Sequence, residues 1–103
     1  MRSIRYVPPT AAQTAGKRLR ALRESLGLSM SDVERRTRVL ATLRHNPRLR
    51  VPKGSLSDIE TKGRTPGIHY LYALARAYGC DVRMLMGFYG LKKRQQRQGF
   101  SRS

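Results

Sequence analysis

Short stop signals divide this 103-residue chain into segments that are too brief for anything but small elements. The stretches GLS (27–29), GRTP (63–66) and GCD (79–81) each place a glycine shortly before a small polar residue. Glycine adopts the left-handed conformation that ends many helices, and Ser, Thr or Asp accepts a hydrogen bond from the first turn of the next helix. This pattern predicts several short helices that must share one small core.

Apolar residues recur at helical spacing in five segments, and no segment alternates as a strand does. The first predicted helix runs from about Thr10, a hydroxyl cap, to Leu26. The others run from Met30 to about Arg44, from Pro52 or Lys53 to Gly63, from a Thr65–Pro66 cap to Gly79, and onward from a capping Asp81. The residues expected to face inward are Leu19, Leu22, Leu26, Val33, Thr37, Leu40, Leu56, Ile59, Ile68, Leu71, Ala75, Tyr78, Val82 and Leu85. We therefore expect an all-α, five-helix domain over residues 10–90, with a flexible N-terminal arm (1–9) and a disordered basic C-terminal tail (91–103).

The charge of the chain indicates a polyanionic partner. Lys and Arg number 22 against 6 Asp and Glu, so the net charge is +16. The basic residues cluster in 35–53 and 91–103, where no acid occurs. Self-repulsion of this size suits a protein that binds nucleic acid or an anionic membrane. No apolar run approaches the roughly 18 residues of a membrane span, which favours nucleic acid.

Several other classes of function find no support in the residues. Cys80 is the only cysteine, which excludes an internal disulfide, and His45 and His69 lack companions for a metal site. No pair of carboxylates or activated nucleophile suggests catalysis, so we expect neither an enzyme nor a cofactor. The first residues lack the apolar stretch of a secretory signal, so we expect a cytoplasmic, nucleoid-associated protein.

The order of helices, with a short polar third helix, is what a helix-turn-helix DNA reader requires. GKRLRALRESLGLSMSDV (16–33), VPKGSLSDIETKGRTP (51–66) and the stretch 68–85 resemble the Cro and phage-repressor (XRE-like) type of helix-turn-helix domain. The resemblance implies a lambda-repressor-like fold, double-stranded DNA as partner and transcriptional regulation in a bacterium or phage. The chain departs from the family by about a dozen extra residues, approximately 38–50, which predict an extended second helix and a basic return loop.

The resemblance also gives a role to a carboxylate beside an apolar residue in this basic chain. Glu60 follows the expected core residue Ile59. In the family the corresponding Glu is buried and pairs with an Arg near the end of the first helix, which is Arg23 here. A bidentate pair at this place would fix the orientation of the third helix. The alternative is a surface Glu that only moderates charge repulsion.

The start of the third helix supplies the candidates for reading bases. Lys53 is a donor for guanine or phosphate, and Gly54 permits close approach of the backbone. Ser55 and Ser57 can bond to bases or phosphates, or serve only as local caps. In the resembling family the position of Asp58 reaches base edges, where an acid accepts from cytosine, but a plain surface Asp is an equal alternative.

Phosphate contacts are expected from three further places. The N–H groups of Met30 and Ser31 begin a helix, and helix starts favour phosphate, although the neighbouring Ser29 is equally well explained as a cap. The basic loop contributes arginines, and the segment after the third helix occupies the family's phosphate-contacting region. The residues expected to contact phosphate are Ser29, Met30, Ser31, Arg48, Arg50, Lys62 and Arg64.

Two other functions stay open at this stage. The charge and basic ends also suit a non-specific DNA- or RNA-binding protein, while small polar residues on the third helix favour specific readout. An antitoxin-like protein-interaction module is the other alternative. The apolar residues near the end of the domain would serve that module or a homodimer seam: Met84, Met86, Phe88 and Tyr89.

Overall fold

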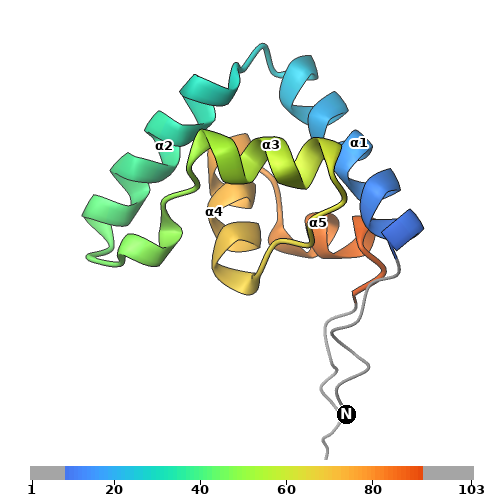
Figure 1. Cartoon of the computed structure of the whole chain (residues 1–103). Helices are drawn as coiled ribbons and strands as arrows, with labels where there is room; N and C mark the ends of the chain where they lie inside the picture. The colour runs from blue at the N-terminus through green and yellow to red at the C-terminus, as the bar shows by residue number, and fades with distance from the viewer. Residues whose placement is uncertain (1–8, 92–103) are drawn as a thin grey trace, which may run out of the picture.

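The computed structural model describes residues 9–91 and has the expected all-α architecture. Its helices are α1 (Pro9–Ser25), α2 (Met30–Leu43), the 3-10 helix η2 (Pro47–Leu49), α3 (Lys53–Thr61), α4 (Ile68–Tyr78) and α5 (Val82–Phe88) (Figure 1). No strand occurs among these residues. The expected arm (1–9) and tail (91–103) lie outside the described residues, apart from Leu91 and from Pro9, which is the first residue of α1 and not part of an arm. The five α-helices and the extended second helix are as predicted.

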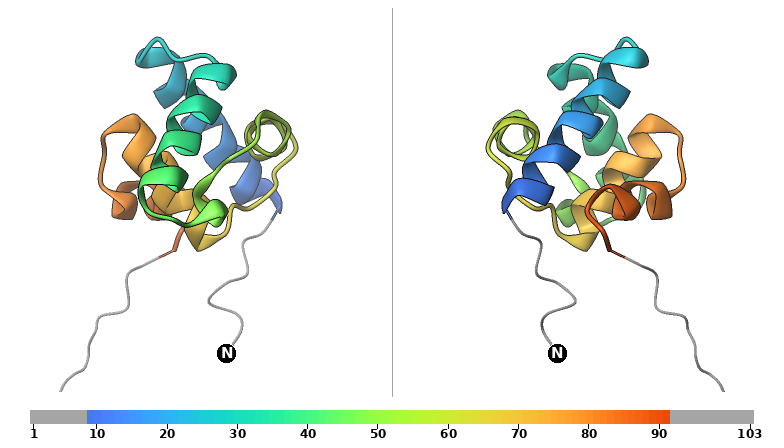
Figure 2. Two further views of the ribbon diagram at one scale, coloured as in Figure 1. Left: turned by 90° about the vertical axis from the view of Figure 1, so that its left-hand side faces the viewer. Right: turned by 90° about the vertical axis from the view of Figure 1, so that its right-hand side faces the viewer.

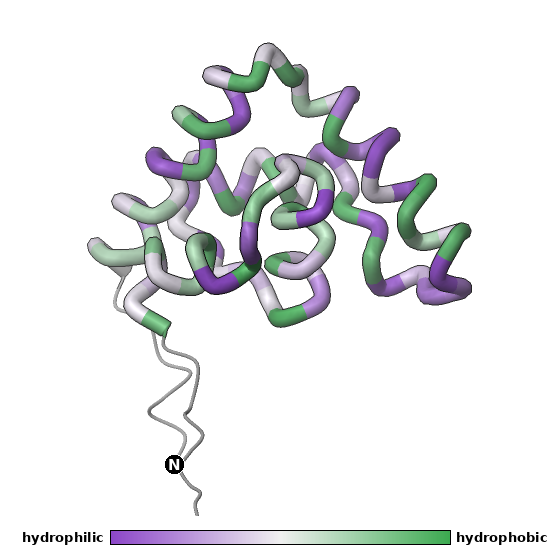
Figure 3. The backbone as a smooth tube through the Cα atoms, turned by 180° about the vertical axis from the view of Figure 1, so that it is seen from behind, coloured by the Kyte–Doolittle hydropathy of each residue, from purple (hydrophilic) through white to green (hydrophobic). Residues whose placement is uncertain are grey.

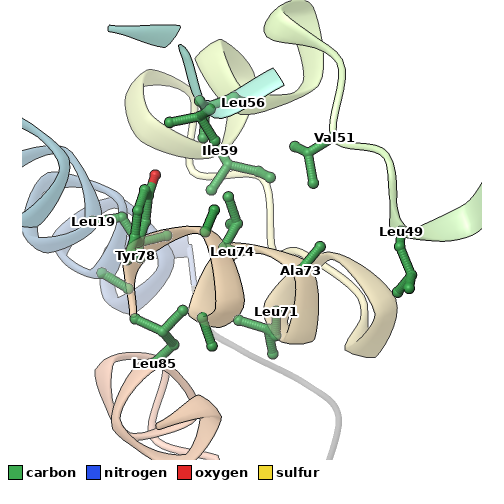
Figure 4. Packing of buried hydrophobic residues seen from close by; sticks show 14 of the residues in the cluster. Leu19, Leu49, Val51, Leu56, Ile59, Leu71, Ala73, Leu74, Tyr78 and Leu85 are labelled. Atoms are coloured by element: carbon green, nitrogen blue, oxygen red, sulfur yellow. The ribbon is translucent and has the colours of Figure 1, made fainter. Parts of the chain in front are cut away.

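α4 is the centre of the packing. It contacts α2, α5 and η2, while α3 lies across α1 and α2 on another side of the molecule (Figure 1 and Figure 2). Polar and apolar residues follow one another along α1 and α2, as expected of helices with one buried face (Figure 3). The buried side chains of α3 and α4 meet in the core, with Leu56 and Ile59 above Leu71 and Leu74 (Figure 4).

Local capping explains most helix ends. The Ser29 hydroxyl accepts from the Asp32 N–H, and the Asp32 carboxylate accepts from the Ser29 N–H, which forms a capping box at the start of α2. Gly79 ends α4 in the left-handed conformation with φ 71°. Asp81 accepts from the Arg83 N–H at the start of α5. These capping and stop signals depend only on neighbouring residues, and the structure confirms the helix ends predicted from them.

The predicted start of α4 is wrong. Thr65 and Pro66 precede the helix, which begins at Ile68 after Gly67, and Gly67 provides no side-chain cap. Pro66 is buried, so it packs the connection after α3 against the core instead of opening a helix. Ile68 is then the first residue of α4 and is 56% exposed, contrary to the prediction.

Two expectations for α1 also fail. The helix begins at Pro9, so Thr10 lies inside it and its carbonyl accepts from the Thr14 hydroxyl. Leu26 follows the last residue of α1, where helical spacing no longer applies, and is 46% exposed. Both errors concern helix ends, where one or two residues change which side chains share a face.

α1 meets α3 through a face of small residues. Gly16 lies against the backbone of α3, where a Cβ would be 2.4 Å from the carbonyl oxygen of Ile59 and 3.0 Å from that of Glu60. Ala12 and Ala15 are buried on the same face. Small side chains therefore allow the two helix backbones to approach closely, and a glycine is required at the point of contact.

The residues that return from α2 to α3 are anchored in the core. Asn46 caps η2, and the side chains of Leu49 and Val51 are buried against α4 (Figure 4). The Thr37 hydroxyl on α2 accepts from the Val51 N–H at 2.9 Å and donates to the Glu34 carbonyl at 3.0 Å. The segment predicted as a basic loop is thus a fixed support for the start of α3.

We predict that Gly16→Ala destabilises the protein by about 1–3 kcal/mol, because the added methyl group meets backbone atoms that cannot turn away. Urea denaturation followed by circular dichroism measures the change. Gly87→Ala is the matched control, since a Cβ at Gly87 meets nothing within 4 Å. The control should gain about 0.5–1 kcal/mol from helix propensity. Equal effects of the two substitutions would contradict the close contact.

Replacing Thr37 by Val should cost about 1–3 kcal/mol, because the Val51 N–H would be buried without an acceptor. Thr37→Ser keeps the hydroxyl and should lose only the methyl packing. Hydrogen exchange at Val51 is the direct measurement, and we expect Thr37→Val to accelerate it more than Thr37→Ser does. Unchanged protection of Val51 in the Val variant would show that the hydrogen bond is unimportant.

Candidate nucleic-acid interface

The structure brings Arg23 and Glu60 together in a buried, bidentate ion pair. Arg23 Nε lies 2.8 Å from Glu60 Oε2, and Arg23 Nη2 lies 3.0 Å from Glu60 Oε1. Arg23 Nη1 donates to the Leu28 carbonyl at 2.8 Å. The two charged residues are only 7% and 4% exposed. One guanidinium therefore joins the end of α1, the turn before α2 and the inner face of α3.

This geometry keeps the pair charged and oriented. Hydrogen bonding to Glu60 raises the pKa of the Arg23 guanidinium above its ordinary value, against the opposing effect of burial. A planar guanidinium facing a carboxylate through two parallel hydrogen bonds allows little rotation. Its contribution is therefore mainly to fix how α3 sits on α1.

The outer face of α3 carries the residues predicted to read bases. Lys53 and Gly54 are exposed at its start, and a Cβ at Gly54 would meet nothing within 4 Å. Ser55, Ser57 and Asp58 are partly exposed. The inner face consists of the buried residues of the helix, so the start of α3 presents a small polar surface that no other described segment covers.

Asp58 is engaged within its own helix and the following turn. Its carboxylate lies 3.6 Å from Lys62 Nζ. Its carbonyl accepts from the N–H groups of Lys62 and Arg64. The ion pair is exposed, so it contributes little to stability. It does leave the charge of Asp58 balanced on a surface otherwise suited to an anion.

At the start of α2 the hydroxyl of Ser29 is occupied as the helix cap. Hydrogen bonds from Ser29, with a smaller contribution from Arg35, lower the pKa of the Asp32 carboxyl, so this group is an anion at neutral pH. This carboxylate accepts from the Ser29 N–H, and its negative charge opposes phosphate binding at the neighbouring Met30 and Ser31 N–H groups. The capping role of Ser29 is thus realised in the structure, and phosphate binding by Met30 and Ser31 stays a prediction.

The arginines of 35–50 divide into paired and unpaired groups. Arg35 pairs with Asp32, and Arg36 donates to the Ala77 carbonyl at the end of α4 at 2.8 Å. Arg50 pairs with Glu34 at 2.7 Å. Among residues 9–91, the side chains of Arg38 and Arg48 have no hydrogen-bond or ion-pair partner. Sequence alone did not indicate which arginines serve the fold.

The segment after α3 places its two basic residues at the surface. Lys62 is exposed, and within residues 9–91 its ammonium group pairs only with the carboxylate of Asp58. The Arg64 guanidinium lies over the ring of Tyr70, 5.6 Å from its centre. Both predicted phosphate-contacting residues are therefore accessible, with Arg64 oriented by an aromatic face.

The apolar residues near the end of the domain do not form one exposed seam. Tyr89 is 3% exposed and belongs to the core, so its predicted place on an exposed dimer or partner surface is wrong. Its side chain packs inward because α5 ends at Phe88 and the chain turns back at Tyr89. The Phe88 ring is partly covered by the guanidinium of Arg18. Met84 is 42% exposed, and Met86 is partly buried.

The arrangement gives no indication of a metal centre or a membrane anchor. Within residues 9–91, His, Cys, Asp and Glu side chains do not gather in groups of three or more that could hold a metal ion. None of the helices in this range combines the length and apolar content needed to cross a bilayer.

Helix order, the fixed third helix and its uncovered polar face together define a helix-turn-helix protein. Residues 14–85 match the family described as a helix-turn-helix domain, and the chain belongs to that family. This membership indicates DNA as the partner. No curated protein and no solved structure matches the chain.

Glu60→Ala should destabilise the protein by about 3–5 kcal/mol, because Arg23 would remain buried without its counter-charge. Chemical denaturation measures the loss. Glu24→Ala is the matched control, since Glu24 forms an exposed pair with Arg20 and its removal should change stability by less than about 0.5 kcal/mol.

The double variant Arg23→Met with Glu60→Leu tests the cause of that loss. It should recover a large part of the stability, because it removes both charges and keeps the volume apolar. A double variant no more stable than Glu60→Ala would show that the loss comes from packing and not from an unpaired charge.

Proposed function

We propose that this protein is a sequence-specific double-stranded DNA-binding regulator of transcription, of the XRE-like, phage-repressor type, with α3 in the major groove. The observation that carries the proposal is the contrast between the two faces of α3. The inner face is fixed by the Arg23–Glu60 pair and the Gly16 contact. The outer face at Lys53 and Gly54 is uncovered. A rigid helix with a free polar face is what direct readout requires.

The residue types on this face suit distinct roles. Lys53 donates to the guanine acceptors O6 and N7 or to a flanking phosphate. Gly54 lets the helix start approach the base edges closely. Ser55 and Ser57 exchange hydrogen bonds with bases or phosphates, and Asp58 accepts from a cytosine amino group. Because all but Lys53 are small or short, α3 can lie deep in the groove.

Surrounding groups position the protein on the DNA backbone. The proposed phosphate contacts are the Met30 and Ser31 N–H groups and the side chains of Arg48, Lys62 and Arg64. Arg50 is a further proposed contact, although part of its charge is balanced by its pair with Glu34. Such contacts supply affinity and register but little sequence information. No catalytic step belongs to this function, which we place in the nucleoid of a bacterium or in a phage-infected cell.

A homodimer on a palindromic site would extend this function. The exposed side chain of Met84, with the partly exposed Met86 and Phe88, is the apolar surface on α5 that favours such a dimer. Two copies would present their α3 helices to half-sites one helical turn apart. The same surface is what an antitoxin-like interaction module would use.

The second candidate function is non-specific binding of nucleic acid, which the net charge of +16 favours. Electrostatic attraction to phosphates alone yields binding that falls steeply with salt and ignores sequence. The two functions differ in one measurable quantity, the ratio of affinities for a selected duplex and a random duplex at the same salt concentration.

Selection of bound duplexes from a random pool, followed by competition titration, tests the proposal. We expect an enriched sequence, and Lys53→Glu should reduce the affinity ratio by about fivefold or more, since a bidentate contact to guanine is worth about 1–3 kcal/mol of discrimination. Arg76→Glu is the matched control. Arg76 is exposed on α4 and its side chain has no partner among the described residues, so the same charge change should lower both affinities and leave the ratio intact.

A pool without an enriched sequence would contradict specific readout and support the second candidate. So would an equal loss of specific and random affinity in the Lys53→Glu and Arg76→Glu variants.

A further inference from the structure

A basic hollow lies between the return segment from α2 and the start of α4. Its volume is about 350 Å³, and its charged and aromatic lining is Arg48, Arg50, Arg64, His69 and Tyr70. Two of these arginines come from the extra residues between the motif helices, and Arg64 comes from the segment after α3. Three cations that are separate in the sequence thus surround one space.

The positive charge in this hollow is not balanced by its lining. No acidic residue lines it. Glu34 pairs with Arg50 from one side, while Arg48 has no side-chain partner among residues 9–91. Arg64 rests on the ring of Tyr70, which orients the guanidinium without using its hydrogen-bond donors. Several donors therefore remain available to an anion with more than one oxygen.

Both walls of the hollow are connected directly to α3. Arg50 stands three residues before Lys53, the first residue of α3, and the Val51 N–H between them is held by Thr37. On the other wall, the Arg64 N–H donates to the Asp58 carbonyl of α3 at 3.3 Å. Figure 1 and the left view of Figure 2 show η2 beside the segment leading into α4, with a short extended stretch joining η2 to the start of α3. A group bound in the hollow would therefore have a fixed position relative to the outer face of α3.

We infer that this hollow binds one phosphate of the DNA backbone, next to the groove that α3 enters. The inference rests on the proposed function and gives the extra residues 38–50 a purpose, since they bring Arg48 and Arg50 to this place. Guanidinium groups bind phosphate oxygens through paired, directional hydrogen bonds, which suits positioning better than a loose basic surface does. The arginines are all exposed, so free phosphate should bind only weakly and a phosphate within a bound duplex should bind well.

The test combines Arg48→Ala with duplexes of the selected sequence that carry one uncharged methylphosphonate, moved stepwise along each strand. In the wild type, methylphosphonates at several contacted positions should weaken binding. Arg48→Ala should abolish the effect at one of them, outside the bases read by α3, and leave the effect at the others. Arg48→Ala should also lower the slope of log affinity against log salt by about 0.9, the value for one phosphate contact. Arg76→Ala, the matched control, should leave the position-specific effect unchanged.

Three other outcomes would overturn the inference. If no methylphosphonate position depends on Arg48 while Lys53→Glu still erodes selectivity, the hollow is not a phosphate site and the proposed function stands. If no sequence is selected and Lys53→Glu leaves the affinity ratio unchanged, the proposed function is wrong, and the inference that rests on it is wrong as well. If inorganic phosphate at millimolar concentration shifts the His69 resonances saturably in the wild type but not in Arg48→Ala, and methylphosphonates have no Arg48-dependent effect, the ligand is free phosphate and not DNA.

Discussion

The buried ion pair between Arg23 and Glu60 is the interaction on which the orientation of α3 and its outer polar face depends. Burying two charges removes them from water, and that desolvation offsets most of their attraction. The pair is therefore better understood as a constraint on orientation than as a source of stability. Glu60 is held twice, because its carboxylate binds Arg23 and its carbonyl lies against Gly16, two turns earlier on the same face of α1. The position of α3 on α1 has little freedom left.

The other end of α3 is fixed by a different device. A long connection between the motif helices would ordinarily leave the start of α3 poorly placed, since a longer loop has more conformations to lose. Here the connection contains a capped 3-10 turn, two buried apolar side chains and a hydrogen bond from Val51 to Thr37. The extra residues therefore hold the start of α3 in a fixed position relative to α2 and α4. Both ends of α3 are held, and the polar face lies between the two supports.

Local signals in the sequence predicted the helices well, whereas tertiary contacts explain the errors. The capping box of Ser29 and the stop at Gly79 depend on neighbours within a few residues, and both could be read directly. Thr65 carries an equally good local signal, yet burial of Pro66 overrides it. Val51 is a single apolar residue in a basic loop without helical periodicity, so the sequence pattern did not indicate that its side chain is buried. The Arg23–Glu60 pair was accessible only through the resemblance of two separate stretches to one family.

In this protein the attraction to the DNA backbone and the discrimination between base sequences come from different segments. The outer face of α3 carries a single cation, Lys53, and a single acid, Asp58, whose charge Lys62 balances, so this face has little net charge. Most of the net charge lies elsewhere, and some of the exposed arginines also form hydrogen bonds within the fold, as Arg36 and Arg50 do. Attraction to DNA then comes mainly from segments around α3, and it weakens as salt rises. Discrimination by short polar side chains depends less on salt, because hydrogen bonds to base edges release few counterions. A protein built in this way loses affinity before it loses selectivity.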